Sequence, residues 1–234
     1  GTGDLESSTT QLPCEQFPAL SDIEICRHVF IQRIPGIDVS ADKAKGLEQL
    51  HAAHSEIRSA LGIGDWPLFT AAQVHGNEIA VIDSCSRGPA GRESPGCDGI
   101  ITNQCSAALG IYVADCCAVY IVDPKTPAIG LVHSGCKGTE LGVVTKAISQ
   151  MVDRFGSDPA NMIVQLSPCI RPPHYEIDFA AEIIRQCRAF GVQQTHDFGI
   201  CTACDLHRYY SYRAEKGKTG RMLAVIGLDP TIAN

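Results

Sequence analysis

Apolar positions along the chain fall into short runs that are typical of buried strands. Residues 23–34, IEICRHVFIQRI, alternate well enough to predict a strand. Residues 68–83 predict two strands broken by the turn signal HGN. Further apolar runs predict strands of a well-buried sheet, and they lie at residues 107–115, 118–123, 128–133 and 161–168. The last apolar run, residues 219–229, fits either a strand or a short helix.

Three longer segments carry the spacing of amphipathic helices. They are residues 40–63, 139–156 and 178–191, and leucine, isoleucine and His54 mark the apolar face of the first. The expected N-caps are Ser40 or Asp42 for the first helix, Thr139 for the second and Asp178 for the third, with Gly156 closing the second helix. Strands and helices are mixed without a regular βαβ repeat, which favours the α+β class.

The organisation of the chain is predicted to be simple. No linker is long enough to divide residues 21–234, so we expect a single domain there. Residues 1–20 are polar and acidic and are expected to form a flexible leader. They lack the basic and apolar regions of a secretory signal, and no apolar run approaches the roughly 20 residues of a membrane helix.

Composition narrows the classes of partner. The chain has 234 residues and a formal net charge of −7, whereas a sequence-independent nucleic-acid binder needs a strong basic footprint. Small molecules are therefore the expected partners, without nucleic acid or membrane, and the oligomeric state is left open. The twelve cysteines, in a chain without a signal sequence, are interpreted as reduced thiols of a cytoplasmic protein, and many as small core residues.

Two histidines and one cysteine stand at the ends of predicted strands. They are His75 in QVHG, Cys116 in ADCC and His133 in LVHSG. Two imidazoles and a thiolate suit a catalytic zinc, which keeps a fourth position for water, and the same set suits copper. Two alternatives remain at this point: the three residues are ordinary core residues, or Cys116 is a nucleophile with His133 as its base, without a metal.

Other clusters carry weaker signals. Cys201, Cys204 and His207 have the spacing C-x₂-C-x₂-H but lack an obvious fourth ligand. His51 and His54 lie three residues apart on the first predicted helix, where a half-buried helix face is the stronger interpretation.

Two segments have the character of an anion site. The turn SGCKGT at residues 134–139 precedes a helix, so its backbone N–H groups and Lys137 suit a phosphate. Residues 207–221 form the one basic and aromatic patch of an acidic protein and include Arg213. A tyrosine there suits stacking on a base, and an arginine suits a phosphate or carboxylate, although a solvated loop explains the patch equally well.

Several motifs together resemble a known family. QVHG, DGIIT, ADCCAVYIVD, VHSGCKG, SPCIRPPHYEI and YYSYRAEKGKTGRM occur in the order found in the YfiH-like, or laccase-domain, proteins. The resemblance runs from about residue 70 to the C-terminus. It implies an α/β/β/α sandwich, similar to the cytotoxic necrotizing factor-type deamidases that use a Cys–His pair. It also implies that His75, Cys116 and His133 are the metal ligands.

The resemblance implies several activities, and this sequence departs from the family motifs at some positions. Family activities include phosphorolysis of adenosine, inosine and methylthioadenosine, adenosine deamination, copper-dependent phenol oxidation and editing of peptidoglycan precursors. The Trp and Arg of the family motif VHAGWRG are Cys136 and Lys137 here, which changes the expected substrate contacts. A non-catalytic binding protein with a vestigial site therefore remains an alternative.

The leading hypothesis is a zinc-dependent, or copper-dependent, enzyme that acts on purine nucleosides with phosphate. His75, Cys116 and His133 would hold the metal. Asp115 would orient one of these ligands without binding the metal itself. Lys137 and Arg213 would contact the phosphate or the sugar. The competing enzyme class is a metal-free Cys–His hydrolase or amidase.

Overall fold

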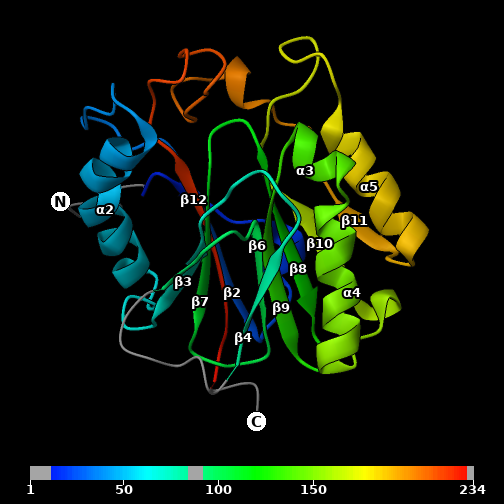
Figure 1. Cartoon of the computed structure of the whole chain (residues 1–234). Coiled ribbons are helices and arrows are strands. Elements are labelled where there is room, and N and C mark those ends of the chain that lie inside the picture. The colour runs from blue at the N-terminus through cyan, green and yellow to red at the C-terminus, as the bar shows by residue number, and fades with distance from the viewer. Residues whose placement is uncertain (1–11, 84–91, 231–234) are drawn as a thin grey trace, which may run out of the picture.

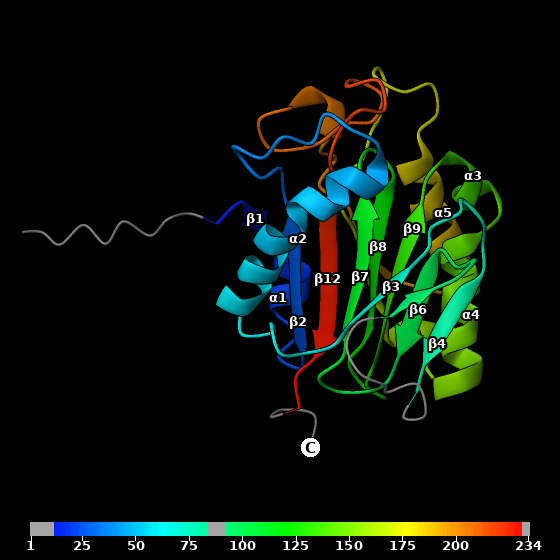
Figure 2. The same ribbon diagram turned by 60° about the vertical axis from the view of Figure 1, so that its left-hand side comes forward.

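The protein is built from two mixed β-sheets that lie face to face and are covered by helices on both outer sides. The computed structural model describes residues 12–83 and 92–230. Helix α2 (Lys43–Ala60) covers the outer face of one sheet, and α4 (Val143–Phe155) and α5 (Phe179–Phe190) cover the other (Figures 1 and 2). The α+β class predicted from the sequence is confirmed, and the layers follow the order α/β/β/α. The predicted likeness to the deamidase toxins stays a prediction.

The first sheet has the strand order β1-β2-β12-β7-β3-β5. Its strands are β1 (Cys14–Glu15), β2 (Cys26–Ile31), β3 (Leu68–Ala71), β5 (Glu93–Ser94), β7 (Ala108–Val113) and β12 (Met222–Leu228). Strand β12 pairs antiparallel with both β2 and β7, so the last apolar run of the chain is a central strand. Strand β3 is parallel to β7 and β5, which makes the sheet mixed.

The second sheet has the order β11-β10-β8-β9-β6-β4. Its strands are β4 (Ile79–Ile82), β6 (Gly99–Thr102), β8 (Cys117–Asp123), β9 (Ala128–Ser134), β10 (Ile163–Leu166) and β11 (Gln194–His196). Strands β8 and β9 form an antiparallel hairpin at the centre, with Ala118 opposite His133. Every residue of both strands is buried, as expected for a central hairpin that is covered on both faces.

Three connections of the described chain run from the first sheet to the second, and one of them joins β5 to β6 through residues 95–98. The other two carry candidate ligands. Of these two, the first joins β3 to β4 through residues 72–78, and the second joins β7 to β8 through residues 114–116. Both connections lie toward the upper end of the sheets in Figure 1. Strand β9, from the second sheet, also ends near this level. The candidate ligands lie on these three segments.

Apolar side chains fill the space between the layers. The largest core lies between the two sheets and includes Phe30, Leu109, Tyr120 and Ala224. The hydroxyl of Tyr120 donates to the carbonyl of Val29 at 2.8 Å, so this buried polar atom keeps a partner. A second core joins the outer face of β8–β10 to α4 and α5, and a third lies beneath α2.

The N-cap residue that the sequence predicted is confirmed for two of the three long helices. Asp42 accepts a hydrogen bond from the backbone N–H of Lys45 at the start of α2, and Asp178 accepts one from Ala181 at the start of α5. Thr139 is not the cap of α4. It lies in the short helix α3 (Cys136–Glu140), and Gly142 in a left-handed conformation (φ 68°) separates this helix from α4. Gly156 closes α4 as predicted.

The predicted leader is wrong in its last part. Residues 1–11 lie outside the described residues, but residues 12–20 belong to the fold. Strand β1 pairs with β2, and the short helix α1 (Pro18–Ser21) follows it. Phe17 and Leu20 are buried in the core between the sheets, so two apolar side chains anchor this segment.

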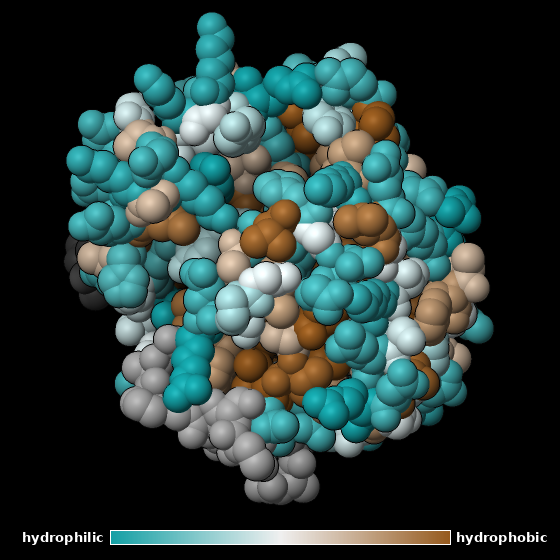
Figure 3. Space-filling model, viewed as in Figure 1, coloured by the Kyte–Doolittle hydropathy of each residue, from teal (hydrophilic) through white to brown (hydrophobic). Residues whose placement is uncertain are grey.

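The surface shown in Figure 3 is mainly hydrophilic, and its apolar residues form separate groups, the most evident of them below the centre of the view. Among the described residues, no helix is both long and apolar enough to cross a bilayer. Nor does any disulfide join the cysteines of residues 12–83 and 92–230. Cys26 and Cys187 are core residues as predicted, and Cys105 is half-buried against the core.

Candidate metal centre

Three side chains that are far apart in the sequence converge between the two sheets. The ligand atoms of His75, Cys116 and His133 all lie within 4.8 Å of one another. His75 comes from the β3–β4 connection, Cys116 immediately precedes β8, and His133 is the penultimate residue of β9. The sequence analysis predicted that His75 and Cys116 end strands. In the structure they lie on the connections between the two sheets.

A buried carboxylate that the sequence analysis did not single out organises this trio. The Asp98 side chain has no exposed surface, and one of its oxygens accepts from Nδ1 of His133 at 2.8 Å. The same carboxylate accepts three backbone N–H groups, from Val74, His75 and Gly76, at 2.9 to 3.1 Å. It therefore fixes both the ring of His133 and the loop that presents His75. Its position in DGIIT, directly before β6, was the available signal.

The charges of the trio favour a thiolate. Burial alone would raise the pKa of Cys116, but the imidazoles of His133 and His75 lower this pKa to about 6. Burial likewise opposes the charged form of His133, whereas Asp98 and Cys116 raise its pKa to about 9. The site without a metal is thus a thiolate–imidazolium pair backed by a carboxylate. A thiolate is the form of cysteine that binds metals and acts as a nucleophile.

The backbone near the trio takes unusual conformations. His75 has φ 63° and Asp115 has φ 94°, both in the left-handed region that non-glycine residues seldom adopt. Gly135 makes a close approach, since a Cβ built there would lie 2.5 Å from Sγ of Cys116. A side chain at position 135 would therefore displace the sulfur. Strain and close packing concentrated at one place are typical of functional sites.

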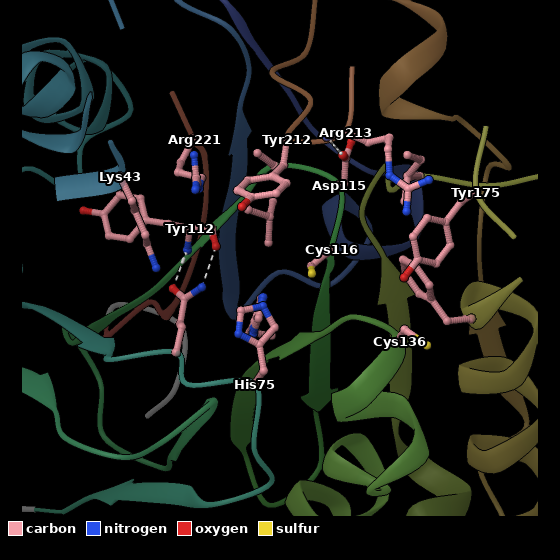
Figure 4. A pocket seen from close by; sticks show the side chains of 16 residues that line it. Lys43, His75, Tyr112, Asp115, Cys116, Cys136, Tyr175, Tyr212, Arg213 and Arg221 are labelled. Carbon is pink, nitrogen blue, oxygen red and sulfur yellow. Dashed lines mark hydrogen bonds between the residues drawn. The ribbon is translucent and has the colours of Figure 1, made fainter. Parts of the chain in front are cut away.

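The trio faces a cavity of about 410 Å³, within the range of small-molecule sites. In Figure 4, Cys116 lies near the centre and His75 below it, with Lys43 and Arg221 on one side and Tyr175 and Arg213 on the other. Tyr112 and Tyr212 also line the cavity, so aromatic and cationic side chains surround the trio. Cys136, which replaces the Trp of the resembled family, lines it as well.

The cationic residues of the cavity differ from those predicted. Lys137 is exposed and is not among the lining residues, so its predicted contact with the ligand is not supported by this geometry. Arg213 does line the cavity, and its guanidinium pairs with Glu176 at 2.8 Å and lies 5.0 Å from the ring centre of Tyr175. Arg221, the last residue of the predicted basic patch, also lines the cavity. Lys43 is the cation that the sequence analysis missed, because α2 reaches the cavity only in the folded chain.

Asp115 has a different task from the predicted one. Its carboxylate accepts from the hydroxyl of Thr202 at 2.8 Å and from the backbone N–H of Arg213 at 2.7 Å. It therefore ties the β7–β8 connection to the segment that follows β11, whereas Asp98 is the carboxylate that contacts a candidate ligand.

The two weaker clusters of the sequence analysis, His51 with His54 and the C-x₂-C-x₂-H segment, have different outcomes. His54 is buried against Tyr112, while His51 is exposed, as expected for a half-buried helix face. Cys201 and Cys204 do form a cluster with a histidine, but the histidine is His174 rather than His207. The ligand atoms of this second trio also lie within 4.8 Å of one another.

Comparisons with known proteins agree on the family. The family model described as "Multi-copper polyphenol oxidoreductase laccase" matches residues 36–182 and 174–229. The purine nucleoside phosphorylase YlmD of Geobacillus stearothermophilus is 28% identical over 191 residues, which cover 66% of this chain and 70% of that protein. A purine nucleoside phosphorylase of Corynebacterium glutamicum is 26% identical and covers 86% of this chain and 94% of its own.

Solved structures support the same fold. The crystal structure of YlmD from Geobacillus stearothermophilus superimposes with a TM-score of 0.77 at 21% identity, covering 88% of this chain and 93% of that one. A Neisseria meningitidis protein superimposes with a TM-score of 0.73 at 20% identity, covering 88% of this chain and 95% of that one.

Proposed function

The chain belongs to the multi-copper polyphenol oxidoreductase laccase family, and on that premise we propose that it is a metal-dependent enzyme that cleaves purine nucleosides with phosphate. The observation that carries the proposal is the His75–Cys116–His133 trio at the base of a cavity lined by cations and tyrosines. The relatives named purine nucleoside phosphorylases support the choice of substrate class.

The donor set of the trio fits zinc. Two imidazoles and one thiolate are a set of three protein ligands that leaves a fourth position for a water or a substrate. The hydrogen bond from Nδ1 of His133 to Asp98 leaves Nε2 as the nitrogen for a metal, as is usual for a histidine ligand backed by a carboxylate. A bound zinc would supply a Lewis acid that stabilises negative charge on an oxygen of the substrates. Copper, the alternative, uses the same three donors.

The residues of the cavity divide the remaining work. Lys43, Arg213 and Arg221 supply positive charge in a protein whose net charge is −7, which suits inorganic phosphate. The rings of Tyr175 and Tyr212 offer faces on which a purine can stack. In phosphorolysis an oxygen of phosphate bonds to C1′ of the ribose, and the bond from C1′ to N9 breaks with its electrons leaving on the purine. Holding phosphate and nucleoside in one cavity lowers the barrier by bringing the reacting atoms together.

A direct assay tests the proposal. Zinc-loaded protein is incubated with adenosine or inosine, with and without phosphate, and the products are separated by chromatography. We expect free purine base and ribose 1-phosphate only when phosphate is present, and loss of the reaction in His75→Ala. Adenosine deamination, a second activity proposed for the same site, would give inosine without phosphate. No turnover with either zinc or copper would reject the proposal and leave a metal-free hydrolase or a binding protein.

A metal-free Cys–His hydrolase is the second candidate, because Cys116, His133 and Asp98 follow the order of nucleophile, base and orienting carboxylate. Metal analysis of protein purified without added metal separates the two candidates. About one ion per chain that is lost in Cys116→Ala supports the metalloenzyme, whereas a metal-free protein alkylated selectively at Cys116 supports the hydrolase.

A further inference from the structure

We infer that His174, Cys201 and Cys204 form a second transition-metal site, of the zinc type, which holds two loops together at one side of the cavity. The three ligand atoms lie within 4.8 Å of one another. Nδ1 of His174 lies 3.4 Å from Sγ of Cys204 and 3.8 Å from Sγ of Cys201. Around a tetrahedral zinc, a nitrogen and a sulfur ligand are about 3.6 Å apart, so the observed separations bracket the ideal value.

The convergence of two sulfurs on one nitrogen is better explained by coordination than by hydrogen bonding. A single N–H group directs its proton to one acceptor at a time, and a neutral ring nitrogen accepts one proton. Here both sulfurs of the C-x₂-C segment approach the same atom, Nδ1 of His174. One ion at the centre of the trio would bond all three atoms at once.

The loops that carry the ligands are already fixed by the protein. Cys169 and Cys201 form an isolated parallel bridge, in which the N–H of Thr202 donates to the carbonyl of Cys169. Arg171 forms a two-pronged pair with Asp197 at 2.7 and 2.5 Å and donates to the carbonyl of Ile200. The segments around residues 171 and 200 are thus held in register, and little ordering is needed for the ligands to meet an ion.

The site differs from the motif that the sequence offered. His207 follows Cys204 at the expected spacing but is exposed and is not part of the cluster. His174, in PPHYEI, takes its place from 27 residues before Cys201. His174 and Cys204 are exposed, so the fourth position of a tetrahedral ion would face solvent and take a water.

The second trio is connected to the cavity through its neighbours in the sequence. Tyr175, next to His174, lines the cavity, and its ring lies beneath the guanidinium of Arg213. Thr202, next to Cys201, donates to the Asp115 carboxylate, which directly precedes Cys116. Figure 4 places Tyr175, Arg213 and Asp115 on the same side of the cavity. An ion at the second trio would therefore stabilise that side without touching the substrate.

Element analysis of untagged full-length protein, purified under reducing conditions with zinc, tests the inference. We expect two zinc ions per chain in the wild type, one in Cys204→Ser and one in His174→Asn. His207→Asn is the matched control, because it removes a nearby exposed histidine outside the trio, and it should keep two. We also expect the zinc-dependent rise in Tm to shrink in Cys204→Ser but not in His207→Asn.

Cobalt spectra test metal binding at the second trio even if His75, Cys116 and His133 do not bind metal. In the Cys116→Ala background, added Co²⁺ should give a sulfur-to-cobalt charge-transfer band that weakens in Cys201→Ser and in Cys204→Ser. A failure of the nucleoside assay leaves this result unaffected, because the two trios share no ligand. The inference is overturned if Cys204→Ser retains the wild-type zinc content, if no such band forms, or if intact mass shows a Cys201–Cys204 disulfide in the native protein.

Discussion

The carboxylate of Asp98 lies 2.8 Å from Nδ1 of His133 and is fully buried. The same carboxylate accepts the backbone N–H of His75, so a single side chain positions two of the three candidate ligands. Burial would raise the pKa of Asp98, but the hydrogen bonds from His133 and from the N–H of Gly76 hold it below its usual value. Asp98 is therefore an anion that keeps the proton of His133 on Nδ1.

Asp98→Asn should weaken metal binding by about 10- to 100-fold, the usual effect of removing a partner behind a ligand. The amide keeps one acceptor oxygen, but it loses the negative charge and one of the two acceptors. Competition with a chromophoric chelator measures the affinity. Asp123→Asn is the control, because Asp123 is equally buried and hydrogen-bonded but lies at the far end of β8. Equal affinities in both variants would contradict the role assigned to Asp98.

Gly135→Ala should displace the sulfur of Cys116 and lower metal affinity at least about tenfold, because a Cβ there would lie 2.5 Å from Sγ. Gly76→Ala is the matched control near the same trio, since the nearest atom to a Cβ there is 3.6 Å away. The same chelator competition compares the two variants. Unchanged affinity in Gly135→Ala would show that the sulfur can move without losing its function.

The sequence predicted what depends on neighbours in the chain and missed what depends on which elements meet. The caps Asp42 and Asp178 and the hairpin β8–β9 follow from local patterns, because a cap or a buried strand is determined within a few residues. The break at Gly142 was missed, since Thr139 is a good capping residue whose hydroxyl instead bonds Ser134 at 2.7 Å.

At the candidate site the same distinction holds. The resemblance pointed to His75, Cys116 and His133, and these do converge. Lys43 was unpredictable, because nothing local distinguishes a lysine in the first turn of a helix that reaches a cavity from one that faces water. Likewise His174 was hidden, since its partners lie 27 and 30 residues further along the chain.

The protein should lose stability as the pH falls from about 6.5 to about 4, in part because of His28. Burial lowers the pKa of His28 from 6.5 to about 4, and its Nε2 accepts the backbone N–H of Phe17 at 2.7 Å. Between these pH values the unfolded chain binds a proton that the folded chain does not, so acidification favours unfolding. Each pKa unit corresponds to about 1.4 kcal/mol, which gives His28 a loss of roughly 3 kcal/mol.

Urea unfolding of wild type and His28→Gln at pH 7.5 and pH 4.5 measures this effect. The glutamine oxygen can still accept from Phe17 but does not titrate, so the variant should lose less stability between the two pH values. His51→Gln, on an exposed position of α2, is the control and should follow the wild type. An identical pH dependence in wild type and His28→Gln would contradict the prediction.

Lys43→Met should raise KM for phosphate by about tenfold or more, while Lys137→Met should change it less than about twofold. Lys43 lines the cavity of the His75–Cys116–His133 trio, where burial and, after it, the charge of the nearby Arg221 lower its pKa. A cation in such a cavity contributes to anion binding, and its removal leaves the anion with fewer charge-assisted hydrogen bonds. Lys137 is exposed and does not line the cavity, so its charge acts through water and is screened by salt.

Initial rates at varied phosphate and saturating nucleoside give KM for phosphate, and element analysis confirms that both variants keep their metal. The opposite ranking, with Lys137→Met the more damaging variant, would place the anion site at α3, which carries Lys137.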